Sequence, residues 1–153
     1  MRKSPSAKKS SDSTEDTLSH WVKLAFHTMR HEMETSLRKS GMTVTQWRAL
    51  GALSRKPGTT HSELVKKLEI EASSVTSLVN GMERKGWVTR ERSTSDARVK
   101  KLFLTPQGSH MIRGAQEETA PIEQRMAATL SERERDALKR LMRTMIEGMR
   151  AAP

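Results

Sequence analysis

Apolar side chains recur at steps of three and four residues along much of the chain, which is the spacing of one face of an α-helix. The first such stripe predicts a helix from about Glu15 to Ser40 that ends at Gly41. Its apolar residues are Leu18, Val22, Ala25, Phe26, Met29, Met33 and Leu37. A second helix is predicted from Thr45 to Arg55, because a Lys-Pro-Gly breaker follows it.

Two short helices joined by a brief polar link are predicted next. The segment Thr60-His61-Ser62-Glu63 fits a capping box, in which the hydroxyl and the carboxylate satisfy free backbone N–H groups at a helix start. This helix is expected to end at Leu68. The following one should run from Ala72 to Lys85, where Gly86 provides a left-handed stop. The close succession of the two helices indicates a helix-turn-helix.

The remainder of the chain predicts a hairpin and two further helices. Two β-prone runs, Trp87 to Arg92 and Val99 to Leu104, bracket a polar segment, as a hairpin requires. Thr105-Pro106 fits the start of a fifth helix, and Pro121 is expected to kink or divide this helix because proline lacks an N–H group. Ser131 to Glu134 is another capping box and begins a sixth helix. The predicted fold class is therefore mainly α with a small β-hairpin wing.

Charge adds information about the partner. The formal net charge of +10 favours a polyanionic partner such as nucleic acid or an anionic membrane surface. No apolar run is long enough to cross a bilayer, and the Ser- and Lys-rich residues 1–14 predict a disordered basic tail rather than a secretion signal. The chain has no cysteine, which excludes a disulfide framework and a thiolate nucleophile. Because this composition fits a reducing compartment, we expect a cytoplasmic protein.

Composition and motifs weigh against other function classes. The sequence has no glycine-rich phosphate loop, nucleophile–base pair or metal-binding cluster at useful spacing, so we expect neither an enzyme nor a bound cofactor. An RNA-binding module would need stacking aromatic side chains, and the chain has only three Trp, two Phe and no Tyr. A protein–protein adaptor that uses a winged fold without touching DNA is a further alternative, against which the basic wing argues.

The fourth helix and the hairpin carry the candidate chemistry. Four apolar residues should pack inward from one face of the helix, namely Val75, Leu78, Val79 and Met82. The opposite face is small and polar and consists of Ser73, Ser74, Ser77, Asn80 and Arg84. Such a face can approach the major groove closely and bond to base edges or phosphates, although a solvated helix has the same composition. From Arg84 to Lys101, seven basic and two acidic residues give a net charge of +5, which suits a wing that neutralises phosphates.

These segments together resemble the multiple-antibiotic-resistance regulator (MarR) family, and its SlyA-like branch in particular. The matching segments are Thr45-Gln46-Trp47, Leu64 to Leu68 with Ile70-Glu71, Met82 to Val88 leading into Arg90, Ser95 to Lys100, and Leu104 to Gly108. The resemblance spans roughly Leu18 to Arg150. It implies a sequence-specific transcription regulator, a repressor, that binds a pseudo-palindromic operator in double-stranded DNA as a homodimer, with one half-site for each winged motif.

The resemblance assigns roles to segments and residues. Residues 15–40 would form a dimerisation helix and scaffold, residues 41–105 the winged helix-turn-helix, and residues 106–153 the dimerisation helices. The residues expected to contact DNA are Ser62, Ser73, Ser74, Thr76, Ser77, Asn80, Arg84, Arg90, Asp96, Arg98 and Lys100. The residues expected at the dimer interface are Leu18, Val22, Leu138, Leu141, Met142, Met145, Ile146 and Met149.

Three residues are singled out by the resemblance. Arg98 would enter the minor groove at the wing tip. Asp96 would orient the Arg98 guanidinium through charge-assisted hydrogen bonds, with an ordinary turn-forming role as the alternative. Ser77 stands where the SlyA-like branch has an arginine. Because serine reads guanine poorly, we expect more reliance on wing contacts and DNA shape.

The sequence also offers candidates for an effector site and a metal site. Proteins of this family often bind small aromatic or anionic effectors where the dimerisation helices meet the DNA-binding lobe, and such an effector would control DNA release. The candidate lining residues are Trp21, Phe26, His27, Trp47 and Met111, each with core packing as the alternative. His20, His27 and His31 lie near one helical face, but the neighbouring sequence supplies too few further ligands, so no metal site is expected and a proton-sensing role has no support.

Overall fold

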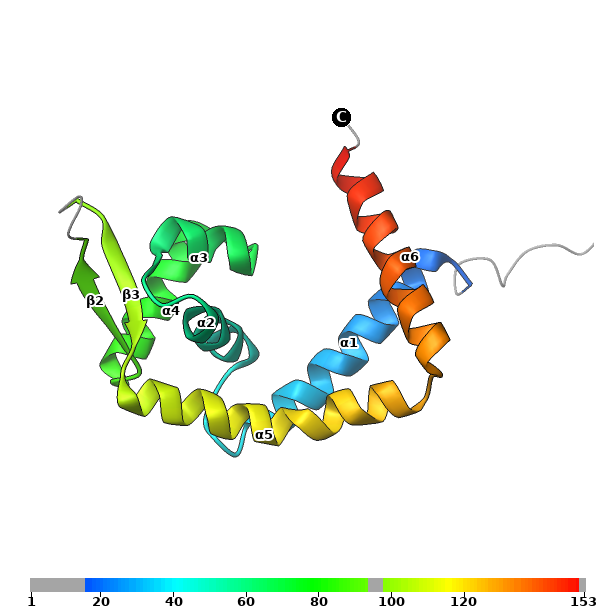
Figure 1. The fold of residues 1–153 in the computed structure, drawn as a ribbon, viewed down its shortest axis with the longest axis horizontal. Helices are drawn as coiled ribbons and strands as arrows, with labels where there is room; N and C mark the ends of the chain where they lie inside the picture. The colour runs from blue at the N-terminus through cyan, green and yellow to red at the C-terminus, as the bar shows by residue number, and fades with distance from the viewer. Residues whose placement is uncertain (1–15, 94–97, 152–153) are drawn as a thin grey trace, which may run out of the picture.

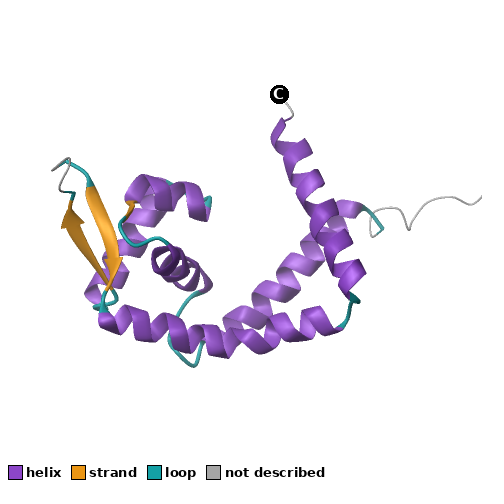
Figure 2. Ribbon diagram, viewed as in Figure 1, coloured by secondary structure: helices purple, strands orange, loops and turns teal. Residues whose placement is uncertain are grey.

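Six helices and three short strands follow one another in the computed structural model, which describes residues 16–93 and 98–151 (Figures 1 and 2). The elements are α1 (Leu18–Leu37), α2 (Val44–Arg55), β1 (Thr59–Thr60), α3 (His61–Leu68), α4 (Ala72–Arg84), β2 (Val88–Arg92), β3 (Lys100–Leu104), α5 (Pro106–Ala128) and α6 (Glu132–Ala151). The predicted mainly α fold with a small antiparallel wing is confirmed. The predicted tail, residues 1–14, and Asp96 lie outside the described residues.

Side-chain caps fix the starts of five of the six helices that the structure describes, including α1, where Thr17 accepts the His20 N–H, whereas α4 has none. Thr43 accepts the Gln46 N–H at 3.1 Å, and the Gln46 side chain accepts the Thr43 N–H in return. The sequence analysis missed this capping box and placed the start of α2 slightly late. The predicted boxes from Thr60 to Glu63 and from Ser131 to Glu134 are both formed, and Thr105 caps α5 as expected. Local hydrogen bonding therefore decides where these helices begin.

The predicted hairpin is part of a three-stranded antiparallel sheet in the order β1-β3-β2. The pairing of β2 with β3 covers all five residues of each strand, Val88–Arg92 and Lys100–Leu104. Strand β1 pairs with the other edge of β3 and was not predicted, because two residues are too few to show alternation. Gly58 leads into β1 at a φ of +78°, which glycine adopts without strain, and donates its N–H to the Leu102 carbonyl at 3.0 Å.

A cluster of buried apolar side chains joins the helices to the sheet. Its largest fully buried members are Leu37, Leu50, Leu53, Leu64, Leu68, Met82, Leu102, Val75 and Val79. They come from α1, α2, α3, α4 and β3, so one cluster fixes α3, α4 and the wing relative to each other. Burial of each such side chain contributes about 1.5 to 3 kcal/mol relative to exposure, which makes this lobe a rigid support.

Helix α5 connects the two ends of the molecule. In Figure 1 the sheet and α2 to α4 lie around the start of α5, whereas α1 and α6 lie toward its later part. The sequence predicted that Pro121 kinks or divides this helix, and the division is wrong because α5 runs through Pro121 as one element. Proline costs a helix one N–H hydrogen bond. Buried Thr119 and Ile122 on either side of Pro121 hold the helix in place, and Thr119 Oγ1 donates to the Ala115 carbonyl at 2.8 Å.

The apolar faces of α1 and α6 are uncovered within this chain. None of residues 132–151 in α6 is buried, and the exposed fractions of Leu138, Leu141 and Met149 are 50%, 64% and 74%. On α1, Leu18 and Trp21 are more than half exposed as well. Large apolar side chains that are exposed on two helices in this way indicate an interaction site. Within the described parts of the chain, none of the helices combines the length and apolarity that crossing a bilayer requires.

Candidate nucleic-acid interface

Helix α4 presents two chemically different faces. Val75, Val79 and Met82 are fully buried and Leu78 is half-buried, as predicted. The opposite face is exposed throughout and consists of Ser73, Ser74, Ser77, Asn80 and Arg84. Its side chains are short until Arg84 at the C-terminal end, so a second molecule can approach the helix backbone closely along most of this face.

Helix α3 supports α4 through a tight turn. Glu69 ends α3 in the left-handed conformation, with φ 56° and ψ 44°, and donates its N–H to the Val65 carbonyl at 2.9 Å. Leu64 and Leu68 anchor the helix in the core. Ser62, one of the residues expected to contact DNA, is exposed in the first turn of α3.

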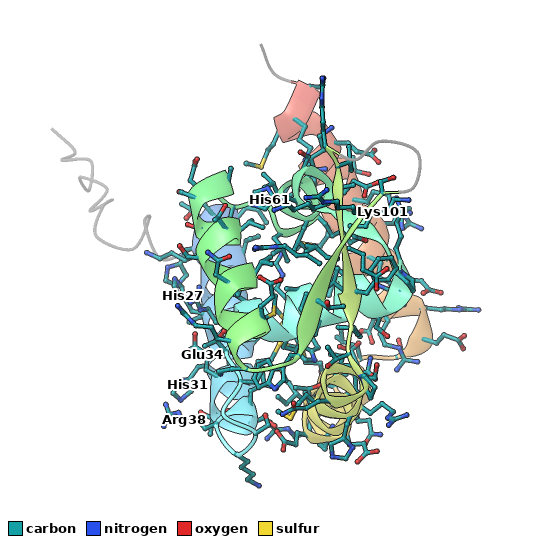
Figure 3. All side chains as sticks on the ribbon, turned by 90° about the vertical axis from the view of Figure 1, so that its left-hand side faces the viewer. His27, His31, Glu34, Arg38, His61 and Lys101 are labelled. Atoms are coloured by element: carbon teal, nitrogen blue, oxygen red, sulfur yellow. The ribbon has the colours of Figure 1, made fainter. Side chains whose placement is uncertain are left out.

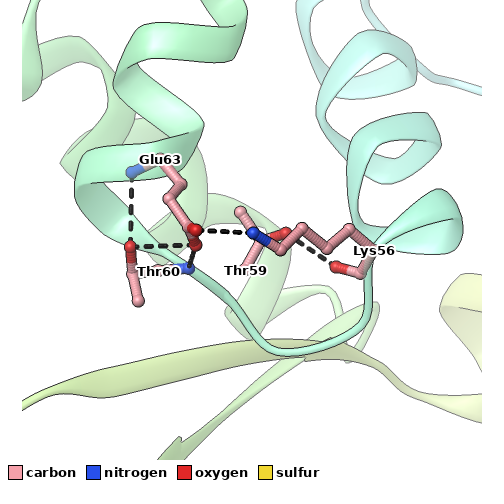
Figure 4. A network of polar contacts seen from close by, with 4 residues as sticks. All are labelled: Lys56, Thr59, Thr60 and Glu63. Atoms are coloured by element: carbon pink, nitrogen blue, oxygen red, sulfur yellow. Dashed lines mark hydrogen bonds and ion pairs between the residues drawn. The ribbon is translucent and has the colours of Figure 1, made fainter.

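A polar network ties the start of α3 to the end of α2 (Figure 4). Lys56 Nζ donates to Glu63 Oε1 at 2.6 Å, and Glu63 Oε2 accepts the Thr60 N–H at 2.8 Å. Thr59 Oγ1 donates to the Lys56 carbonyl at 2.6 Å. The hydrogen bond from Lys56, followed by those from the backbone and side chain of Thr60, lowers the pKa of Glu63 from 4.5 to about 2. The network therefore depends on an ionised Glu63.

We expect Glu63→Gln to weaken the fold at neutral pH and to flatten its acid dependence. Because the pKa of Glu63 is lowered in the folded state, its stabilisation is present above the unfolded pKa of 4.5 and is lost as the pH falls through about 2. Urea unfolding at a series of pH values measures this, with Glu123→Gln, exposed on α5, as the charge-matched control. Superimposable pH profiles for the wild type and Glu63→Gln would rule out the contribution.

A contact between α3 and α4 was not predicted. His61 Nε2 lies 3.0 Å from Thr76 Oγ1, and the Thr76 hydroxyl donates its one hydrogen to the Ala72 carbonyl at 3.0 Å. With the hydroxyl hydrogen directed to Ala72, Thr76 Oγ1 acts as the acceptor in this contact, which corresponds to the His61 tautomer with its hydrogen on Nε2. Thr76 was expected to contact DNA, and its hydroxyl hydrogen is already used within the protein. No spacing rule joins these two positions in the sequence, so only the folded structure reveals the pair.

Arg90 on β2 bridges the wing and α4. Its Nη2 donates to Asn80 Oδ1 at 2.7 Å, and its Nη1 lies 3.0 Å from Glu83 Oε2. The side chains of Arg90 and Glu83 are each 29% exposed, so this ion pair is largely shielded from water. Arg90 and Asn80 were both expected to contact DNA, whereas Glu83 was not singled out. Opposite charges on either side of the Gly86 turn are the sequence signal that could have identified the pair.

Other basic residues of this region divide into two groups. Lys85 is directed toward the protein, with Nζ donating to the Gly41 carbonyl at 3.3 Å and lying 4.3 Å from the Trp87 ring centroid. Arg92, Arg98 and Lys100 are exposed along the strands and near the turn that joins them. Exposed cations at this position are suited to neutralising phosphates. Asp96, which was expected to orient Arg98, cannot be placed because it lies outside the described residues.

A cleft of about 160 Å³ lies between α2, α3 and α5. Its lining includes Trp47, Arg48, Arg55 and Lys67. Of the five residues expected to line an effector site, Trp47 alone is in this cleft. Met111 packs half-buried against the core, while Trp21, Phe26 and His27 are exposed on α1. Within the described residues, the buried Trp47 Nε1 has no hydrogen-bond partner.

The histidines of α1 are spread along the helix and do not form a cluster. Figure 3 shows His27 and His31 on α1, apart from His61 in the lobe that holds α4. His27 packs edge-on against Phe26, with ring centroids 5.7 Å apart, and His20 contacts its neighbouring tryptophan in the same way. In the described parts of the chain, no three His, Asp or Glu side chains come together as a possible metal site.

Comparison with known proteins identifies relatives of this lobe. Residues 40–99, which hold α2 to α4 and β2, match the model of the MarR family. The HTH-type transcriptional repressor MdtR of Bacillus subtilis is 30% identical over 100 residues, which cover 65% of this chain and 64% of the repressor. The repressor IacR of Pseudomonas putida is 27% identical over 135 residues, covering 88% and 81%. The S. aureus MepR–DNA complex superimposes with a TM-score of 0.82 and 25% identity over 90% of this chain and 99% of that one. These relatives are transcription regulators and not enzymes.

Proposed function

We propose that the chain is a transcription regulator of the MarR family that represses transcription by binding a pseudo-palindromic operator in double-stranded DNA as a homodimer. The observation that carries this proposal is the exposed serine and asparagine face of α4 beside a basic wing. MdtR and IacR are named as repressors, and MepR was solved in complex with DNA, which supports the same role here. A regulator of genomic DNA would act in the cytoplasm. The wing residues favour the SlyA-like branch, from which Ser77 departs.

The proposed DNA contacts divide by chemistry. Major-groove contacts come from the exposed face of α4, namely Ser73, Ser74, Ser77 and Asn80. Ser62, Arg84 and Lys100 are exposed around this face and would bond to phosphates. Arg98 enters the minor groove, oriented by Asp96. Thr76 and Arg90 lie at the same surface, although each already has a partner within the protein.

Arg98→Ala is expected to weaken DNA binding by roughly 1 to 3 kcal/mol while leaving the oligomeric state unchanged. The loss follows from removing one phosphate- or groove-directed cation from the wing. A gel-shift titration on a duplex from upstream of the coding sequence measures it. Arg113→Ala, exposed on α5 and remote from the wing, is the charge-matched control. Unchanged affinity for Arg98→Ala would refute the role of the wing.

A second copy of the chain is the proposed cover for the apolar faces of α1 and α6. The residues concerned are Leu18, Val22, Leu138, Leu141, Met142, Met145, Ile146 and Met149, which leaves the helices of residues 15–40 and 106–153 as the dimerisation part. Leu18, Leu138, Leu141 and Met149 are each at least half exposed in the single chain, so their burial would contribute strongly to association. Two copies would present two α4 faces to successive half-sites. A monomer at micromolar concentration in sedimentation equilibrium would contradict the homodimer.

Effector control is proposed at the cleft between α2, α3 and α5. Trp47 offers an aromatic surface, and Arg55 and Lys67 offer positive charge, so the cleft suits a small aromatic carboxylate. A ligand that binds the folded state raises its melting temperature. We expect benzoate and its hydroxylated derivatives to stabilise the wild type and the control Arg113→Met, but not Arg55→Met. No shift with any aromatic acid would exclude this class of effector.

A further inference from the structure

The forked contact of Arg90 fixes the orientation of the Asn80 side-chain amide. A guanidinium group carries only donors, so the Asn80 atom that lies 2.7 Å from Arg90 Nη2 has to be the carbonyl oxygen Oδ1. The other arm of the guanidinium is held by Glu83 Oε2 at 3.0 Å, which keeps the fork from turning with Asn80. The amide nitrogen Nδ2 is therefore the group that exposed Asn80 presents away from β2.

We propose that Arg90 is a positioning residue that makes Asn80 a hydrogen-bond donor toward DNA, so that Asn80 reads an acceptor atom on a base edge in the major groove. The inference rests on the proposed function, because it requires α4 to enter the groove. An unrestrained asparagine can read adenine by accepting from N6 and donating to N7. That pair of bonds needs Oδ1 and Nδ2 to face the base together, and Arg90 turns Oδ1 toward β2.

The position of Asn80 on α4 favours a base edge over a phosphate. Steps of four and three residues lead from Ser73 to Ser77 and on to Asn80, so the three side chains lie on one stripe of the helix. Ser77 is the middle of this stripe, and Asn80 lies one turn further along it, on the same face that the proposed function places in the groove. A purine N7 or a guanine O6 in the groove accepts one N–H from Nδ2, which is the contact that this geometry allows.

The charges around Arg90 also favour a positioning role for this residue over a direct contact with DNA. Glu83 compensates the guanidinium charge at 3.0 Å, and both side chains are largely shielded from water. A phosphate would have to compete with the Glu83 carboxylate for the same donors. Arg90 therefore acts on DNA through Asn80, in contrast to Arg92, which is exposed further along the same strand.

The test compares affinity for the upstream duplex with affinity for a random duplex of equal length. Arg90→Lys keeps the charge, but one ammonium group cannot replace a planar fork that holds Asn80 and Glu83 together. We expect affinity for the upstream duplex to fall about tenfold and affinity for the random duplex to stay within about twofold of the wild-type value. Arg113→Lys, at an exposed position on α5, is the matched control and should leave the ratio unchanged. Asn80→Ala should lower the ratio as much as Arg90→Lys, and the double variant no further.

Base analogues provide a second test, which does not depend on any Arg90 variant. Replacing single purines by their 7-deaza analogues, or single guanines by 2-aminopurine, which lacks O6, should weaken wild-type binding at one position in each half-site, and Asn80→Ala should be insensitive at that position. A methylphosphonate linkage removes the charge of one phosphate. If Asn80→Ala loses sensitivity to such a linkage and not to a base analogue, Asn80 contacts a phosphate and the base-reading inference is wrong.

Four outcomes separate the claims. Equal loss for both duplexes in Arg90→Lys, or no loss for either, would overturn the positioning role. Additive effects of Arg90→Lys and Asn80→Ala would overturn it as well. If the wild type itself shows no preference for the upstream duplex, the proposed function fails, and this inference fails with it. Thermal unfolding of each variant confirms that the compared proteins are folded.

Discussion

Gly108→Ala is expected to destabilise the protein by about 3 kcal/mol or more, because the added methyl group overpacks a closed contact. A Cβ on Gly108 would lie 1.9 Å from the Trp87 carbonyl oxygen and 2.9 Å from its carbon. These are backbone atoms, and the same carbonyl accepts the Thr105 N–H at 3.1 Å. Either the start of α5 or the start of β2 must move, so the wing should lose its position together with the stability.

Circular dichroism melting measures this effect against a control on the same helix. A Cβ on Gly114 would meet no atom within 4 Å, so Gly114→Ala should gain up to about 1 kcal/mol from helix propensity. For a chain of this size, 1 kcal/mol corresponds to roughly 2 to 4 °C in melting temperature. The two alanine variants should therefore shift in opposite directions. Equal melting temperatures for Gly108→Ala and the wild type would mean that α5 does not close against Trp87.

Ser77→Glu should reduce DNA affinity about a hundredfold or more without loss of fold. Ser77 is exposed in the middle of the polar face of α4, so its replacement leaves the core untouched. In the proposed complex the new carboxylate would be held between two phosphate backbones, where like-charge contacts cost several kcal/mol. Ser77→Ala should have a much smaller effect, because a neutral serine contributes little compared with a charge placed in the groove.

Gln124→Glu is the matched control for Ser77→Glu. It adds the same charge at an exposed position of α5, far along the chain from α4. Fluorescence anisotropy on the upstream duplex should show wild-type affinity for this control within about twofold, since distant surface charges are screened by salt. If Ser77→Glu binds as tightly as Gln124→Glu, α4 does not enter the groove.

Features set by neighbouring residues could be predicted from the sequence. The capping boxes that begin at Thr60 and Ser131 need only a hydroxyl and a carboxylate three residues apart, and both are formed. The division of α4 into a buried face with Val75 and Val79 and an exposed serine face follows from helical periodicity. The basic character of the wing likewise required only a count of charges along the chain.

Features that depend on distant residues could not be predicted in the same way. Strand β1 exists because Thr59 pairs opposite Leu102, and nothing within its two residues marks it as a strand. The sequence analysis assigned Arg90 directly to DNA. Its partners Asn80 and Glu83 come close only when β2 folds back on α4, so the sequence could not show that Arg90 is bound within the protein. Gly108 was noted only as the end of the segment Leu104 to Gly108. The structure shows why a glycine is required there, because the carbonyl of Trp87 packs against it and leaves no room for a Cβ.

The central claim is that two copies of this chain bind one operator through α4 and the wing. A salt series of equilibrium binding titrations with the upstream duplex, in competition with random duplex, tests this claim most directly. The account predicts two protomers per duplex, preference for the upstream sequence, and log affinity falling linearly with log salt as several phosphates are neutralised. Equal affinity for random duplex, or affinity independent of salt, would contradict it.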